Sequence, residues 1–314
     1  MTNLLFSLNT VTPVFLIILL GFYLKRCEMI TSAFIDTSSK VVFNIAMPAL
    51  VFAKLASADF QSTFQIKPIL IAYSGTISFF GIAWLLAIVL TKEGKDQGAF
   101  IQASFRSNFA IVGFAIIFNI FGESGLSKAA LLLAFVMPLY NVLAVIALAT
   151  TTNLQKQIPI KKTIKEIVTN PLIIAAFVAI PCALFRIKIP FFAAKAIDYL
   201  AAMTLPLALI GIGGSLHFYS LREYSALTFI AAAIKIIILP LSLILITIFL
   251  GIRGEMAGVL FVMFASPTAI ASFIMARAMG ANSELAGNII VATTLGSVIT
   301  ISLGIFLLKS FALI

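Results

Sequence analysis

Ionisable side chains are scarce in this chain of 314 residues. Charged residues make up 10% of it, where a soluble domain has about 25%, and it holds one histidine and two cysteines. No Gly-x-x-x-x-Gly-Lys-Ser/Thr loop is present to hold a nucleotide phosphate, and no His/Cys/Asp/Glu cluster has the spacing of metal ligands. These absences argue against an ATP-driven pump and against an intramembrane enzyme, so we expect no cofactor and no metal.

Long apolar runs dominate the sequence, and hydrophobic residues make up 62% of it. A helix needs about 20 apolar residues to cross the hydrocarbon of a bilayer, and weak period-2 alternation excludes an outer-membrane barrel. The sequence therefore predicts an all-α polytopic membrane protein with ten transmembrane helices. They are expected at about 5–25, 34–57, 67–91, 98–121, 126–152, 166–187, 192–216, 224–250, 255–279 and 284–308.

The placement of basic residues predicts the topology. The first ten residues carry no charged side chain, whereas Lys25 and Arg26 directly follow the first apolar run, so the amino terminus is expected outside the cell membrane. With ten spans the carboxyl terminus is expected outside as well. Cys27 and Cys182 then fall near opposite faces, which excludes a disulfide. The net charge of +10 lies in short loops and does not indicate a nucleic-acid partner.

The two halves of the chain resemble each other. Pro48-Ala-Leu and Pro206-Leu-Ala interrupt apolar segments 158 positions apart, close to half the length of the chain. Internal repeats with broken helices are typical of secondary transporters, whose binding site lies where the repeats meet. We therefore predict a first five-helix repeat at 1–152, a short cytoplasmic linker at 153–164 and a second five-helix repeat at 165–314. Pro48 and Pro206 are predicted helix breaks.

The positions of the charges favour an anionic substrate. All eleven acids fall in loops or near span ends, and the deepest, Asp36 and Asp198, are interpreted as interfacial helix caps. Four cations lie inside predicted spans: Lys54, Arg106, Lys235 and Arg277. An interior with cations but without acids suits an anion. Lys54 and Lys235 are interpreted as side chains that reach out to the membrane surface.

Polar residues gather in the fourth and ninth spans. An unwound helix there would direct free N–H groups and a positive helix end at a carboxylate. At the same offset of 158, Asn108 in the first half is equivalent to Ser266 in the second. The alternative for Asn108 is an interhelical hydrogen bond that serves packing alone. Arg106 and Arg277 are expected to supply a positive field around the site. The candidate substrate-binding residues are Asn44, Ser107, Asn108, Gly113, Asn141, Ser266, Pro267, Thr268 and Ser272.

At these positions the sequence resembles the auxin efflux carrier family, which comprises plant PIN-type exporters and bacterial relatives often associated with malate or malonate. The resemblance covers essentially the whole chain. It rests on the order of four short motifs: Asn44-Ile-Ala-Met-Pro-Ala-Leu-Val-Phe, Asn108-x4-Gly113, Asn170-Pro-Leu, and Pro267…Ala276-Arg277…Gly280 followed by Ala292-Thr-Thr-Leu.

The resemblance implies a five-plus-five inverted repeat, similar to that of bile-acid symporters and sodium/proton antiporters. Spans 4 and 9 would be broken helices that cross in a mobile core, with spans 1, 2, 6 and 7 as scaffold and Asn108 at the substrate carboxylate. Plant members have a proline in each crossover where this chain has Ala115 and Ser272. The breaks are therefore expected at Gly113 and Pro267.

The leading hypothesis is a carrier that moves a small organic anion, such as an auxin-like carboxylate, malate or malonate, by alternating access. A sodium-coupled organic anion symporter is the alternative, since backbone carbonyls can form a sodium site without acids. A receptor that binds without transport is a further alternative, but it would be expected to carry a soluble output domain. The expected partners are the anion, the lipid bilayer and, for a homodimer, a second copy of the chain.

Overall fold

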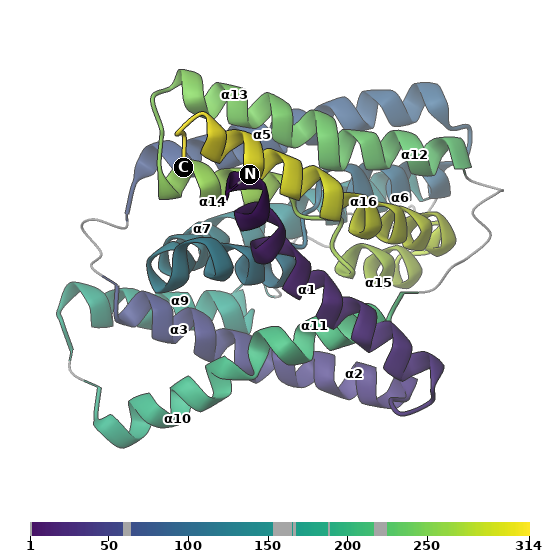
Figure 1. Ribbon diagram of the computed structural model, residues 1–314. Coiled ribbons are helices and arrows are strands. Elements are labelled where there is room, and N and C mark those ends of the chain that lie inside the picture. The colour runs from purple at the N-terminus through teal and green to yellow at the C-terminus, as the bar shows by residue number, and fades with distance from the viewer. Residues whose placement is uncertain (1, 59–63, 153–164, 166–167, 188, 217–224) are drawn as a thin grey trace.

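The computed structural model describes residues 2–58, 64–152, 165, 168–187, 189–216 and 225–314, so the predicted linker at 153–164 lies outside the described residues. Within them the regular structure is helical, with three one-turn π-helices labelled η (Figure 1). The elements are α1 (Thr2–Arg26), α2 (Ser32–Val41), η1 (Val42–Ala46), α3 (Met47–Ala56), α5 (Ile66–Leu90), α6 (Gly94–Phe105), η2 (Phe109–Gly113), α7 (Phe114–Thr151), α9 (Pro171–Leu184), α10 (Phe191–Ala202), α11 (Thr204–Gly214), α12 (Ser225–Ala233), η3 (Ile234–Ile238), α13 (Leu239–Phe249), α14 (Glu255–Ala265), α15 (Ala271–Ala278) and α16 (Ser283–Ser310).

Seven of the described helical segments are long and apolar enough to cross a membrane, so the chain is an integral membrane protein. The sequence predicts ten spans, and the difference has three sources. Residues 109–151 count as one segment although the chain turns within it, α9 has only 14 residues, and the ninth predicted span is divided into α14 and α15.

The ends of several helices follow from local side-chain chemistry. Thr31 caps α2 by accepting a hydrogen bond from the N–H of Phe34, and Asn282 caps α16 by accepting one from Leu285. Inside α7, Gly122 has φ 60° and ψ −143°, a conformation that a glycine adopts without steric cost. The chain therefore turns at Gly122, in the loop that the sequence predicts between its fourth and fifth spans.

The helices form two groups that lie side by side in Figure 1. In the first group α1 packs along α11, and α3 packs against α9 and α10; α2 completes it. The second group contains α5, α6, α7 and α12 to α16, with α14 against α7 and α13. The groups meet where α7 contacts α1 and α3 and where α1 contacts α16. The first group contains the predicted spans 1, 2, 6 and 7.

Close approach of two backbones holds α1 against α11. A Cβ atom added to Gly213 would lie 1.9 Å from the carbonyl oxygen of Ile18, so no larger residue fits there without displacing a helix. Small residues of this kind are how membrane helices come close enough to gain van der Waals contact. The first helix group is therefore closely packed at its centre.

Candidate functional site

Two unwound segments cross between the halves of the chain. Helix α6 ends at Phe105, where Arg106 becomes extended (φ −76°, ψ 121°), and α14 ends at Ala265 before α15 begins at Ala271. Ser107 and Thr268 form an isolated antiparallel bridge. The N–H of Asn108 donates to the carbonyl of Pro267 at 2.7 Å, and the N–H of Ala269 donates to that of Arg106 at 3.2 Å.

Side chains from each break cap the helix that precedes the other break. The Ser107 hydroxyl donates to the carbonyl of Met263 at 2.6 Å, and the Thr268 hydroxyl donates to that of Ala103 at 2.7 Å. The last carbonyls of a helix have no partner within it, so these hydroxyl groups satisfy buried acceptors that would otherwise be costly. The crossing is thus hydrogen-bonded in both directions.

The bridge pairs Ser107 with Thr268, 161 positions later in the chain. It is a contact and does not define equivalent positions of two repeats, so the equivalence of Asn108 with Ser266 at an offset of 158 stays a prediction.

Two of the predicted helix breaks, Gly113 and Pro48, need correction. Gly113 is helical (φ −61°, ψ −47°), and the chain unwinds at 106–108 instead, whereas Pro267 does lie between α14 and α15. Pro48 does not end its helix, because Ser32–Ala56 is one continuous helical segment in which the π-turn η1 directly precedes the proline. The helix is interrupted near Pro206, because α10 ends at Ala202, the residue whose carbonyl the ring of Pro206 would meet in a continuous helix.

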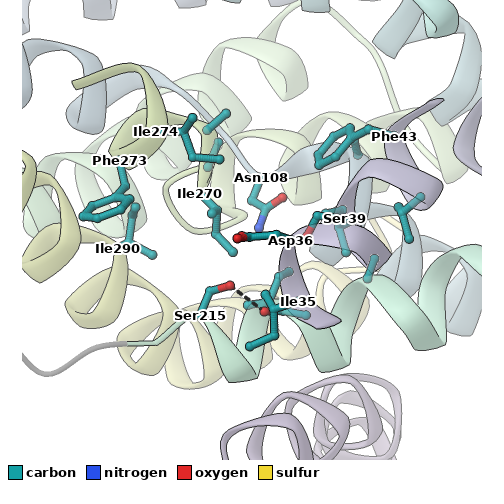
Figure 2. A pocket seen from close by; sticks show the side chains of 18 of the residues that line it. Ile35, Asp36, Ser39, Phe43, Asn108, Ser215, Ile270, Phe273, Ile274 and Ile290 are labelled. Carbon is teal, nitrogen blue, oxygen red and sulfur yellow. Dashed lines mark hydrogen bonds between the residues drawn. The ribbon is translucent and has the colours of Figure 1, made fainter. Parts of the chain in front are cut away.

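A cavity of about 680 Å³ reaches the crossing from the end of the molecule where α1 ends and α2 begins. Its walls come from the unwound segment 106–108 and from α2, η1, η2, α7, α11, α15 and α16. Asn108, from the unwound segment between α6 and η2, and Asp36, from α2, both point into it (Figure 2). Among the predicted site residues, Asn44, Arg106, Ser107, Asn108 and Arg277 line this cavity.

Two helix amino termini lie at the deep end of the cavity, and the Asp36 carboxylate points into the same space. Helix η2, which continues as α7, starts directly after Asn108, and Ala269 to Ala271 at the start of α15 also line the wall. The first N–H groups of a helix lack intrahelical partners and carry the positive end of the helix dipole. Two helix amino termini therefore face the same space, an arrangement that suits a carboxylate.

Arg106 is 6% exposed at the cavity wall and is held in place by two side chains. Its guanidinium donates to Asn141 Oδ1 at 2.8 Å and lies 2.7 Å from the sulfur of Met275. Asn141, a candidate ligand in the sequence, does not line the cavity and instead orients Arg106. Arg277 is exposed and lines the same cavity.

The remaining predicted site residues lie behind the wall. Ser266, Thr268 and Ser272 are completely buried, and neither they nor Gly113 and Pro267 line the cavity. The Ser266 hydroxyl donates to the carbonyl of Val262, and the carbonyl of Ser272 accepts from Gln102 at 2.7 Å. These residues build the crossing. Asn44, which lines the cavity, donates to the carbonyl of Lys40 at 2.9 Å.

One acid of the cavity was misinterpreted from the sequence. Asp36 does not cap a helix, because Thr31 caps α2, and its side chain lines the cavity. Ser32, Ser39 and Lys40 line it too, at helical spacing from Asp36. This polar stripe is the sequence signal that would have identified α2 as a cavity wall.

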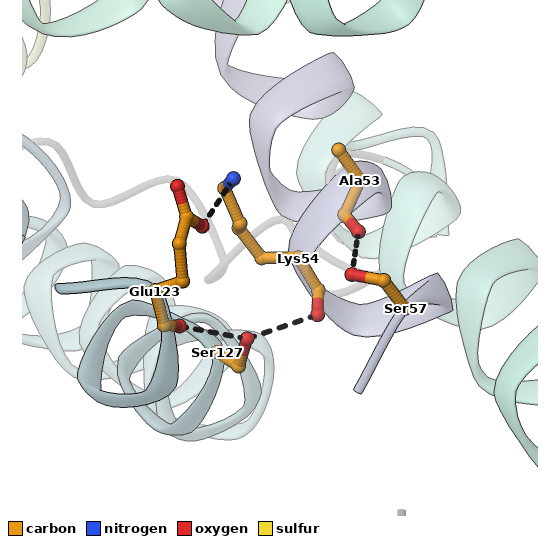
Figure 3. Close-up of polar contacts among 5 residues, drawn as sticks. All are labelled: Ala53, Lys54, Ser57, Glu123 and Ser127. Atoms are coloured by element: carbon orange, nitrogen blue, oxygen red, sulfur yellow. Dashed lines mark hydrogen bonds and ion pairs between the residues drawn. The ribbon is translucent and has the colours of Figure 1, made fainter. Parts of the chain in front are cut away.

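A second cavity, of about 590 Å³, lies on the other side of the crossing. It is lined by Ala115, Asn119, Asp198 and the ion pair of Lys54 with Glu123. Asp198, the second predicted cap, lies in the middle of α10 and does not cap it. Lys54 is ion-paired across the helix groups, and the Ser127 hydroxyl donates to its carbonyl at 3.1 Å (Figure 3). These contacts tie α3 to α7.

The interpretation of Lys235 as a side chain that reaches the membrane surface is wrong. Lys235 is 0% exposed, and its ammonium donates to the carbonyl of Phe264 at 2.6 Å. Sequence spacing gave no sign of this contact, because η3 and α14 are brought together only by tertiary packing.

Comparison with known proteins identifies relatives along the whole chain. A family model described as "Membrane transport protein" matches residues 6–157 and 156–305. An uncharacterized transporter of Methanocaldococcus jannaschii is 26% identical over 94% of this chain and 97% of its own length. A putative malonate transporter of Rhizobium meliloti is 24% identical over 96% of each chain. The uncharacterized transporter YfdV of Escherichia coli is 22% identical over 96% of this chain and 97% of its own.

Proposed function

The chain belongs to the membrane transport protein family, as its resemblance to auxin efflux carriers predicts, and on that premise we propose that it carries a small organic anion across the cell membrane by alternating access. It is a transporter rather than an enzyme. The proposal includes ten spans in a five-plus-five inverted repeat, both termini outside, and the first helix group as the scaffold against which the second moves.

The observation that carries the proposal is the cavity that ends at Asn108. Its deep wall combines the Asn108 side chain, two helix amino termini and the guanidinium of Arg106. Each of these stabilises a carboxylate, and the surrounding isoleucines and phenylalanines would accommodate an apolar body. The anion is therefore proposed to bind with its carboxylate at Asn108, between the helix groups.

The two cavities support alternating access. The larger one reaches the crossing from the end predicted to be cytoplasmic, and Lys54 and Glu123 join the helix groups at the opposite end. On the predicted topology, we propose that this arrangement is the inward-facing state. Movement of α7 away from α1 and α3 would break the Lys54–Glu123 contact and open the second cavity.

Counterflow in proteoliposomes tests the proposal. Because one relative is named a putative malonate transporter, malonate heads a panel of labelled mono- and dicarboxylates, with neutral amides of the same size as controls. We expect at least one carboxylate to exchange, and Asn108→Ala to reduce that exchange at an equal protein level. Exchange of the amides at the rate of the acids would contradict the proposed selectivity for anions.

A further inference from the structure

Lys235 is a buried cation that neither cavity uses. It lies in the π-turn η3, is 0% exposed and lines neither of the two cavities. Its ammonium donates to the carbonyl oxygen of Phe264 at 2.6 Å. Burying a lysine in the middle of a membrane protein is expensive, so its retention indicates a specific partner for the charge.

That partner is the carboxyl-terminal end of α14. In the described part of the chain the ion pairs are Lys54–Glu123 and Lys128–Glu255, and no carboxylate pairs with Lys235. Phe264 is the last residue but one of α14, so its carbonyl belongs to the negative end of the helix dipole. The ammonium is thus stabilised by a helix end at the crossing.

The neighbouring carbonyls at this helix end are occupied as well. Val262 accepts from the N–H and the hydroxyl of Ser266, and Met263 accepts from the Ser107 hydroxyl. Carriers with broken helices bind coupling sodium ions through carbonyls of this kind, at half-helix carboxyl ends. Here protein donors already satisfy three successive carbonyls, and one of these donors is positively charged.

We propose that the Lys235 ammonium is a built-in cation that takes the place of a coupling sodium ion at the crossing, so that transport is independent of sodium. This inference rests on the proposed function and decides against the sodium-coupled alternative. A fixed charge in a low-dielectric interior repels a second cation strongly at a separation of a few ångström. Removal of the charge, with space left behind, would turn this position into a site for a small cation.

Thermal unfolding of the purified protein in sodium chloride and in equimolar choline chloride tests the inference without any substrate. The wild type is expected to unfold at the same temperature in both salts. Lys235→Ala leaves both a vacant space and an unpaired carbonyl, so sodium is expected to raise its midpoint by about 2 °C or more above the value in choline. Lys235→Met fills the space without charge and is expected to show no sodium response.

Two outcomes would overturn the inference: a sodium-specific stabilisation of the wild type, or responses of Lys235→Ala and Lys235→Met that do not differ. The wild-type measurement remains decisive if Lys235→Ala does not fold. Lys54→Met, which removes a cation outside the crossing, is the matched control and should be as indifferent to sodium as the wild type. Because no transported anion is involved, failure of the counterflow experiment and failure of this one are separate results.

Discussion

The backbone N–H of Asn108 donates a 2.7 Å hydrogen bond to the carbonyl of Pro267, while the Asn108 side chain faces the cavity. The backbone and the side chain of Asn108 therefore have different roles. The backbone joins the two breaks, and the amide group remains available to a ligand. A substitution at Asn108 can therefore remove the ligand contact while the crossing stays hydrogen-bonded.

Asn108→Ala is expected to weaken anion binding about ten- to a hundred-fold, because a hydrogen bond to a charged group contributes about 1.5–3 kcal/mol. The thermal midpoint should change little, since the backbone contact remains. Binding of the transported anion to the purified variant, measured by calorimetry, checks the affinity. A variant that loses stability but keeps its affinity would mean that Asn108 only packs helices.

Thr268→Val is expected to have the opposite effect to Asn108→Ala, with a loss of stability and little change in anion affinity. Thr268 is fully buried behind the cavity wall, and its hydroxyl donates to the carbonyl of Ala103. Valine has nearly the same shape but leaves that carbonyl without its donor, at a cost of about 1–3 kcal/mol in the free energy of unfolding. We expect a lower thermal midpoint with anion affinity close to that of the wild type. An affinity loss as large as that of Asn108→Ala would instead make Thr268 a ligand.

Apolar runs fix the helices of this chain, because continuous hydrophobic stretches in a membrane have few alternatives to a helix. The positions of the breaks follow from tertiary contacts instead. Residues 106–108 unwind because Pro267 and Thr268 offer hydrogen bonds across the crossing, whereas local sequence favoured Gly113. The sequence could indicate Asn108, Arg106 and Arg277 as candidates, because polar residues within apolar runs stand out. It could not reveal that Asn141 orients Arg106 or that Lys235 is buried, because both depend on tertiary contacts.

Lys54→Gln should loosen the contact that joins the helix groups beside the second cavity. The side chains of Lys54 and Glu123 are 18% and 64% exposed, so the pair contributes at most about 1 kcal/mol to folding. That amount is still enough to shift an equilibrium between two conformations. In a protein with Cys27→Ser and Cys182→Ser, we expect Ala115→Cys, at a buried position that lines that cavity, to react faster with a maleimide when Lys54→Gln is added. An unchanged rate would contradict a gating role for the pair.

Labelling of a native cysteine tests the topology. Cys27 is exposed and directly follows α1, and Lys25 and Arg26 predict that it faces the cytoplasm. In a Cys182→Ser protein, a membrane-impermeant maleimide added to intact cells should leave Cys27 unmodified and should modify it after permeabilisation. Rapid labelling in intact cells would place the amino terminus inside and reverse the assignment of both cavities.

Arg277 is exposed at the wall of the larger cavity and supplies positive charge there. An anion that enters this cavity from water benefits from the charge more than from any one hydrogen bond, because charged walls focus the field in a cleft. Arg277→Gln is therefore expected to slow exchange of the anion more than Arg277→Lys, which keeps the charge but loses the planar guanidinium.

Exchange rates in proteoliposomes at low and high salt provide the measurement. The control is Arg253→Gln, which removes a cation that lines neither cavity. The gap between the two Arg277 variants should narrow at high salt as the field is screened. Equal rates at low salt would show that Arg277 does not contribute to anion entry and would leave Arg106 as the cation of the site.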